Sequence, residues 1–387
     1  MFSSFLLGLR AARRIGAASR LYERSDFSDA MGVYAELLAS LDRPDVDFEI
    51  PWCRAGASTA LSGYCLSAAK LDRTAEIVEM LARWRPRYRG WMAGGALSSQ
   101  ERSTFAWFER FFAPARVVYP EWQGCANPAV HAGAQWLADA FLDAPAALRV
   151  DAPSTELLEV ANGVIGLRSI ARRFEAALLE LRETAPSRIF LIGGTCGTEA
   201  APLAYLNERW EGQLAVVWFD AHADLNTPAS SPSGRFHGMV LRTLLGEGPE
   251  EYTRQLRRPL APGQIFLAGC RDLDPPEARY VEEQRLVVSE VSGATSGRAL
   301  ADRIRDAGFD RAYVHLDVDV LDPRSFPDML VPTPGGPSLE QLTECIRELA
   351  QATDVVGFSV VEYCGQSSES RAQLVRLLEG SGLVGDS

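Results

Sequence analysis

Two clusters of acidic and histidine side chains, each placed directly after an apolar run, could together bind metal ions. The runs are Leu214–Phe219 and Ala312–Leu316, and their length and polar stop predict buried parallel strands. The clusters that follow them are Asp220, His222 and Asp224 in the first and Asp317 and Asp319 in the second. Alternation along an extended backbone would aim the three side chains of the first cluster the same way.

Each cluster alone also has an ordinary structural explanation, because Asp and Asn at strand ends form turns and Asp-Pro opens loops. Together the clusters favour chemistry, since carboxylates held close repel one another unless a cation lies among them. The sequence therefore predicts a carboxylate-rich metal site at the carboxyl edge of a sheet.

Asp-Ala-His-Ala-Asp at 220–224 and Asp-Val-Asp-Val-Leu-Asp-Pro at 317–323 resemble the paired signature of the arginase (ureohydrolase) family. The resemblance extends over the second part of the chain. It implies two divalent metal ions, Mn²⁺ by preference, both bridged by Asp220 and Asp317. It further implies that the remaining ligands are Asp319 and His222 at one ion and Asp224 and Cys196 at the other.

Cys196 departs from the family pattern. It lies in Gly-Gly-Thr-Cys-Gly-Thr-Glu at 193–199, where the family usually has Gly-Gly-Asp-His-Ser, and so takes the place of a histidine ligand. A thiolate is a softer ligand than imidazole, which makes Zn²⁺ an alternative to Mn²⁺. A subgroup that acts on N-hydroxyarginine resembles this chain in carrying cysteine there; a buried, inert cysteine is the structural alternative.

The same resemblance implies roles for residues around the metal site. Asp224 would orient the attacking water, His237 would carry a proton to the departing amine, and Glu362 would hold the guanidinium through charge-assisted hydrogen bonds. The contacts to the carboxylate and amine of an α-amino acid would come from Asn226, Ser233 and Asp274. Two other histidines, His131 and His315, are expected to pack or to form hydrogen bonds.

The sequence departs from the arginase family pattern at three further places. These departures make a modified guanidine an alternative to L-arginine as substrate. Thr195 replaces an aspartate, Leu330-Val331-Pro332 replaces a Gly-Thr-Pro loop, and Tyr363-Cys364-Gly365 follows Glu362 where the family has x-Asn-Pro. The last two segments are expected to line the guanidinium end of the pocket. An N-hydroxylated guanidine is therefore the main competing substrate.

Strand and helix patterns alternate from the Ala-Pro-Ala segment at 113–115 onward. The predicted strands are Arg116–Tyr119, Arg188–Ile192, Leu214–Phe219, Gln264–Ala268, Arg285–Val288, Ala312–Leu316 and Val355–Val361. The helical patterns between most of them are Pro128–Phe141, Ile165–Arg182, Glu199–Arg209, Arg298–Arg305 and Leu339–Ala350. This alternation predicts a three-layer α/β/α domain at 113–387, with a mostly parallel sheet and with ligands at the carboxyl ends of its strands. By resemblance, the fold is arginase- or deacetylase-like.

Residues 1–112 have helical spacing and predict a small all-helical accessory module. Leu-Asp-Arg occurs at 41–43 and again at 71–73, which indicates a degenerate helix-pair repeat. We interpret Arg83–Trp91 as a solvated turn with cation–π packing, with a single-strand-binding surface as the alternative. Met1–Tyr22 predicts a basic first helix, with a mitochondrial-type presequence as the alternative.

Composition narrows the class of protein. The formal net charge of −12 over 387 residues argues against nucleic acid or an anionic membrane as the main partner. Seven cysteines without CxxC pairing fit a reducing cytoplasm, and no apolar run is long enough to span a membrane.

These observations predict a cytoplasmic, binuclear-metal amidinohydrolase that acts on a small-molecule guanidino substrate and, by resemblance, forms a homo-oligomer. It would hydrolyse arginine or a related guanidino amino acid to urea, or hydroxyurea, and an amine. Two alternatives come from other classes. One is a single-zinc, deacetylase-like amide hydrolase, which the softer Cys196 ligand favours; the other is a catalytically weak scaffold that acts through its helical module.

Overall fold

The computed structural model describes residues 2–42, 46, 51–71, 73–93, 97–109, 114–141, 148–365 and 367–383. The chain forms two compact units, Met1–Ala113 and Pro114–Ser387. Arg43 and Asp72, which belong to the two Leu-Asp-Arg segments, lie outside the described residues.

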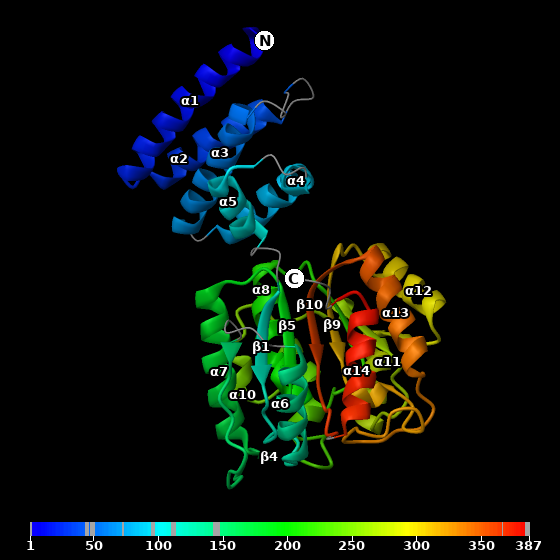
Figure 1. The fold of residues 1–387 in the computed structure, drawn as a ribbon. Coiled ribbons are helices and arrows are strands. Elements are labelled where there is room, and N and C mark those ends of the chain that lie inside the picture. Colours follow the sequence, from blue (N-terminus) through cyan, green and yellow to red (C-terminus); the bar gives the residue numbers. More distant parts are fainter. Residues whose placement is uncertain are drawn as a thin grey trace. The chain divides into compact units, whose positions relative to one another are not determined.

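The first unit is helical throughout its described residues (Figure 1). Its helices are α1 (Phe2–Glu23), α2 (Phe27–Leu41), α3 (Pro51–Lys70), α4 (Thr74–Ala93) and α5 (Ser99–Glu109). Apolar side chains spaced three or four residues apart face a common core, as expected for amphipathic helices. This core includes Tyr34, Leu38, Leu61, Trp84 and Phe105.

The interpretation of Arg83–Trp91 as a solvated turn was wrong. The segment is part of helix α4. Trp84 and Tyr88 are buried one turn apart in the core, on either side of Pro86, which lies inside the helix. The cation–π packing is present, since the Arg87 guanidinium lies 5.1 Å from the centre of the Trp84 ring. The aromatic side chains of this segment therefore serve the core of the unit.

The second unit is built on an eight-stranded sheet whose neighbouring strands all run parallel. Its strand order is β2-β1-β5-β10-β9-β6-β7-β8. The strands are β1 (Ala115–Tyr119), β2 (Leu148–Arg149), β5 (Ile189–Gly193), β6 (Ala215–Phe219), β7 (Ile265–Ala268), β8 (Val287–Ser289), β9 (Arg311–Leu316) and β10 (Asp354–Val360). A separate antiparallel pair joins β3 (Val160–Ala161) to β4 (Val164–Ile165). All seven predicted strands are present; β2 and the short pair were not predicted.

Helices cover both faces of this sheet (Figure 1), which confirms the predicted three-layer fold. One face packs against α6 (Ala129–Phe141), α12 (Ala294–Asp306), α13 (Leu339–Ala352) and α14 (Ser368–Gly380). The other packs against α7 (Leu167–Thr184), α8 (Ala200–Arg209), α10 (Glu250–Thr253) and α11 (Pro275–Gln284). Along α7 the buried positions include Leu167, Ile170, Phe174, Leu178 and Leu181, a spacing that places one apolar stripe on the sheet.

Helices α11 and α14 were missed by the sequence analysis. The missed signals were capping residues. Asp274, directly before Pro275, forms a capping box with Glu277 in the first turn of α11, and the Ser367 side chain caps α14. None of the helices among the described residues is long and apolar enough to cross a membrane.

Candidate functional site

The predicted site residues follow four neighbouring strands at the middle of the sheet, β5, β10, β9 and β6, apart from Asp274, which follows β7. Cys196 comes shortly after β5, Glu362 after β10, Asp317 directly after β9 and Asp220 directly after β6. Because the strands are parallel, their carboxyl ends meet at one edge, which is where open α/β sheets bind ligands. Residues more than a hundred positions apart thereby become neighbours.

The side chains at this edge form two overlapping groups that could each hold a metal ion. In each group the candidate ligand atoms all lie within 4.8 Å of one another. The groups are Cys196, Asp220, His315 and Asp317, and Asp220, His222 and Asp319. Five of the six predicted ligands are thus brought together, and Asp220 is shared by both groups.

The second group is tied together by close contacts. His222 Nδ1 lies 3.2 Å from Asp220 Oδ1 and 3.1 Å from Asp319 Oδ2. The Asp319 backbone N–H donates to Asp317 Oδ1 at 2.8 Å, and the Ala221 N–H donates to Asp319 Oδ1 at 3.1 Å. Backbone donors therefore fix the carboxylates before any ion is bound.

The backbone that orients the side chains of the first cluster differs from the predicted extended strand. Strand β6 ends at Phe219 and a bend follows, so Asp220, His222 and Asp224 do not alternate along an extended strand. Asp224 has a left-handed backbone with φ of 52°, and its side chain lies against the same cavity as that of His222. A bend and one strained residue, not strand alternation, orient these ligands.

Burial and like charge act together on the carboxyl groups. Burial, reinforced by the neighbouring carboxylates, holds the pKa values of Asp224 and Asp317 well above their ordinary range and raises the pKa of Asp319 to about 7. Burial would also raise the pKa of Asp220, but His222 and His315 hold it below its ordinary value. Asp224 Oδ2 is buried with no hydrogen-bond partner. Such crowding is what a bound divalent cation would relieve, so the residues present fit a metal centre.

Cys196 lies in the same constellation. Its Sγ is 3.2 Å from Asp317 Oδ2, and its backbone N–H donates to Glu362 Oε1 at 2.9 Å. Burial, with the surrounding carboxylates, holds the pKa of its thiol well above the ordinary range. The thiolate therefore needs a cation beside it, which is the condition under which cysteine binds a metal.

Glu362 and His237 form a second functional pair next to the ligand groups. His237 Nδ1 lies 3.3 Å from Glu362 Oε1. Glu362 Oε2 is buried without a hydrogen-bond partner, and the residue is held in a left-handed backbone with φ of 61°. An unpaired buried carboxylate oxygen is costly unless a ligand supplies a donor.

The three predicted substrate contacts lie at the same cavity. Asn226 Nδ2 donates to Asp274 Oδ2 at 2.9 Å, while Asn226 Oδ1 accepts from Ser230 Oγ at 2.8 Å. Ser233 Oγ accepts from the Arg235 N–H at 3.3 Å. Asn226 and Asp274 thus form one hydrogen-bonded unit.

A cavity of about 170 Å³ is bordered by the candidate ligands, by His237 and Glu362, and by the predicted substrate contacts. Its size fits a small-molecule ligand. Val331 lines it, as expected, but Cys364 does not; Cys364 and Leu330 pack instead beside Trp122. Only part of the two departing segments therefore borders the cavity.

Among the described residues, His315 and Glu199 are two buried neighbours of this site to which the sequence analysis gave no part; Glu277, which lines the cavity, is another. His315 stands two residues before Asp317, which follows β9 directly and keeps an extended backbone, so strand periodicity places both side chains on the same side. That spacing was the available signal. His131, in contrast, behaves as predicted, with Nδ1 at 2.7 Å from the Pro120 carbonyl.

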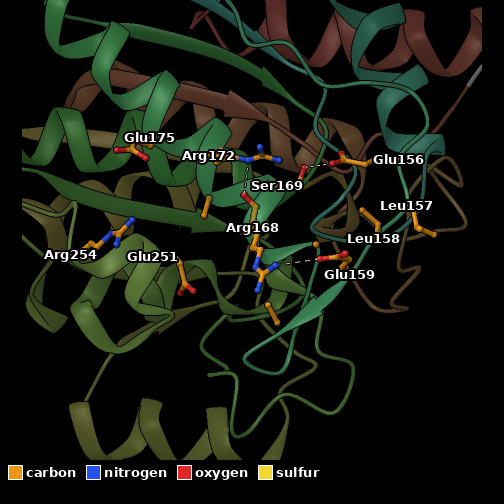
Figure 2. A pocket seen from close by; sticks show the side chains of 13 residues that line it. Glu156, Leu157, Leu158, Glu159, Arg168, Ser169, Arg172, Glu175, Glu251 and Arg254 are labelled. Carbon is orange, nitrogen blue, oxygen red and sulfur yellow. Dashed lines mark hydrogen bonds and ion pairs between the residues drawn. The ribbon is translucent and has the colours of Figure 1, made fainter.

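A larger hollow of about 710 Å³ lies elsewhere on the second unit and shares no residue with the site cavity. Figure 2 shows its charged lining, in which Arg168 reaches toward Glu159 at 3.6 Å. Its rim carries Leu157, which is 92% exposed. None of the predicted site residues lies there.

Comparison with known proteins gives a consistent picture. Residues 143–377 match the family model described as the arginase family. An arginase of Staphylococcus aureus (strain MRSA252) is 30% identical over 178 residues, which cover 44% of this chain and 59% of that protein. The chain thus spans about three fifths of the length of this curated relative.

Solved structures resemble the chain over a longer stretch. Entamoeba histolytica arginase in complex with L-ornithine has a TM-score of 0.62 at 21% identity, covering 69% of this chain and 97% of that one. Arginase from Bacillus caldovelox has a TM-score of 0.62 at 23% identity, covering 71% of this chain and 99% of that one. At these identities the structures show a shared fold.

Proposed function

The chain belongs to the arginase family, and on that premise we propose that it is a binuclear-metal amidinohydrolase. It hydrolyses the guanidinium group of arginine or a related guanidino amino acid to urea, or hydroxyurea, and an amine. One observation carries this proposal: two candidate ligand groups that share Asp220 lie beside a glutamate whose second oxygen is unpaired.

The metal ligands in this proposal are Cys196, Asp220, His222, Asp224, Asp317 and Asp319. Divalent cations held there, Mn²⁺ or Zn²⁺, supply a Lewis acid and lower the pKa of bound water toward neutrality. The chain's part is to fix the ligands beforehand, as the backbone donors to Asp317 and Asp319 do.

Three side chains act on the substrate. Glu362 accepts guanidinium N–H groups at its free Oε2, because its Oε1 is already engaged by the Cys196 N–H. Asp224 offers its unpaired Oδ2 to orient the attacking water. His237, next to Glu362, passes a proton to the departing amine.

The substrate is a small α-amino acid. Asn226 and Ser233 would contact its carboxylate and Asp274 its amine, and all three line the cavity. The bound L-ornithine of the Entamoeba histolytica arginase supports a basic amino acid as the product. Val331 offers the guanidinium end no hydroxyl, so N-hydroxyarginine competes with arginine in this proposal.

We extend the proposal to the setting of the enzyme. It acts in the cytoplasm as a homo-oligomer, without nucleic acid or membrane as partner. The acidic balance of the chain and its family membership support these statements. Light scattering on the full chain tests the assembly; a molar mass equal to one chain contradicts it.

Reconstitution with Mn²⁺ or Zn²⁺ tests the activity. The metal-loaded protein is offered arginine, N-hydroxyarginine, agmatine and other guanidino acids, and urea or hydroxyurea and the amine are measured. We expect two ions per chain and turnover of one α-amino guanidino acid. One ion per chain with amide hydrolysis would favour the single-zinc alternative, and no ion with no turnover would favour the scaffold.

A further inference from the structure

His315 is buried next to the candidate metal ligands, and its ring nitrogen Nε2 faces Asp220. Its side chain is fully buried, and Nε2 lies 3.6 Å from Asp220 Oδ2, beyond hydrogen-bond length. Neither ring nitrogen has a hydrogen-bond partner among the described residues, although Nδ1 lies beside Glu199 and Nε2 beside Asp220. His315 belongs to the ligand group with Cys196, Asp220 and Asp317. A buried imidazole without hydrogen bonds, next to two carboxylates and a thiol, is costly unless a ligand engages it.

The ring is fixed from two sides. Nδ1 lies 3.2 Å from Glu199 Oε1, and the other Glu199 oxygen accepts from the Tyr313 hydroxyl. The ring also stacks on Trp218, with centres 3.5 Å apart and planes 9° from parallel. A carboxylate this close to Nδ1 is placed to accept its proton once Nε2 binds an ion, which is how proteins orient metal-binding histidines.

The separations between the candidate ligand atoms suit a shared ion. Zinc binds nitrogen and oxygen at about 2.0–2.2 Å, so two such ligands at a tetrahedral ion lie roughly 3.3–3.6 Å apart. His315 Nε2 and Asp220 Oδ2 are 3.6 Å apart, at the upper end of this range. Cys196 Sγ and Asp317 Oδ2 are 3.2 Å apart, somewhat closer than the roughly 3.5 Å expected for a Zn–S bond of about 2.3 Å. All four candidate atoms lie within 4.8 Å of one another, so side-chain shifts on the order of 1 Å would bring them around one ion.

We propose that His315 Nε2 is a direct metal ligand, which completes a set with Cys196, Asp220 and Asp317, and that Glu199 is its positioning residue. The inference rests on the metal centre of the proposed function. It makes one of the two sites a sulfur, nitrogen and oxygen set suited to Zn²⁺, in which His315 takes the place that the proposed function gives to Asp224, next to the site of Asp220, His222 and Asp319.

Cadmium NMR tests the coordination directly. The full chain, labelled with ¹⁵N at its four histidines, is loaded with ¹¹³Cd²⁺ as a zinc surrogate. We expect scalar coupling between ¹¹³Cd and ring nitrogens of two histidines, with one coupled signal lost in His315→Gln. Coupling confined to His222 would overturn the inference, because His315 would then only face Asp220. If His315→Gln does not fold, the number of coupled histidines in the unsubstituted chain decides.

Affinity measurements separate the ligand from its support. His315→Gln should lose binding of one of the two Zn²⁺ ions, whereas Glu199→Gln should bind that ion about 10–100-fold more weakly while keeping the coupling. His131→Gln, a buried histidine outside both ligand groups, is the matched control and should leave Zn²⁺ affinity unchanged. Unchanged affinity in His315→Gln would refute the inference. Both readouts are independent of hydrolysis, so a chain that shows the coupling but no turnover would refute the proposed function alone.

Discussion

Glu362 presents a buried carboxylate oxygen without a partner beside the ligand groups, and this oxygen is the proposed guanidinium acceptor. Glu362→Gln replaces one oxygen with an N–H donor that repels the guanidinium. Loss of a buried charged partner costs about 2–5 kcal/mol, so kcat/KM should fall by at least about 30-fold. Steady-state hydrolysis of the accepted substrate measures it.

The control for this substitution is Glu348→Gln, which removes a carboxylate paired with Arg298 at the surface. It should hydrolyse at the unsubstituted rate. Equal losses in the two variants would mean that Glu362 acts only through general stability.

Glu121 should make the stability of the folded protein depend on pH. It is buried, accepts from the Gly124 N–H and from Thr195 Oγ1, and its burial raises its pKa from 4.5 to about 7. Because the folded pKa is the higher one, the folded state holds this proton more tightly. The stability that the proton contributes is full below pH 4.5 and is lost as the pH rises through 7.

Glu121→Gln removes this titration. In metal-free protein, the free energy of unfolding of the unsubstituted chain relative to Glu121→Gln should fall between pH 4.5 and 8 by on the order of 3 kcal/mol. Urea unfolding at both pH values measures it. Glu175→Gln, which removes an exposed carboxyl, is the control, and a difference independent of pH would contradict the prediction.

At the scale of elements, Arg271 stabilises the loop that carries the second acidic cluster, Asp317 and Asp319. Its five N–H groups lie within hydrogen-bond distance of six backbone carbonyls, so at least one N–H is shared; the carbonyls are those of Gly269, Asp319, Val320, Leu321, Thr333 and Pro334. These carbonyls come from the end of β7, from the turn after β9 and from the segment after it. One planar cation thus links three segments around Asp319.

Arg271→Lys keeps the charge but loses the fork, so it leaves several of these carbonyls without a donor. We expect a loss of about 2–4 kcal/mol in unfolding free energy and weaker metal binding. Denaturant unfolding and competitive metal titration measure both effects. Arg298→Lys, at an exposed ion pair, should change neither quantity. If metal affinity is unchanged in Arg271→Lys, Arg271 does not support the metal site.

The elements also show what sequence reasoning can reach. Buried strand runs such as Leu214–Phe219 were predictable because parallel strands need continuous apolar residues. Helix α11 was missed because few of its residues are apolar and only Glu277 and Tyr280 are buried in it. The bend at 220–222 and the left-handed backbone of Asp224 were missed because a sequence of alternating polar residues does not distinguish them from a continued strand.

The site was predictable as a set of strand ends, but its internal contacts were not. Cys196 and Glu362 are 166 positions apart, and the hydrogen bond between them depends on the strand order β5-β10. His315 reads in the sequence as a core residue. Its relation to Glu199 becomes visible only when helix and strand are packed together.

At the scale of the whole molecule, the two units each have a hydrophobic core of their own. Tyr34, Trp84 and Phe105 belong to the core of the first unit, and the sheet with its two helical layers forms the cores of the second. All the proposed site residues fall in Pro114–Ser387. The first unit is therefore dispensable for the chemistry in our proposal.

A chain cut to Pro114–Ser387 should fold, bind two divalent ions and hydrolyse the same substrate, because its cores and its ligands are complete. The full chain should unfold in two transitions, since units with separate cores lose their structure independently, and the cut chain should reproduce one of them. Denaturant unfolding followed by tryptophan fluorescence, with metal titration of both proteins, measures these quantities. A single transition in the full chain, with a cut chain that neither folds nor binds metal, would show that the helical unit is part of the enzyme.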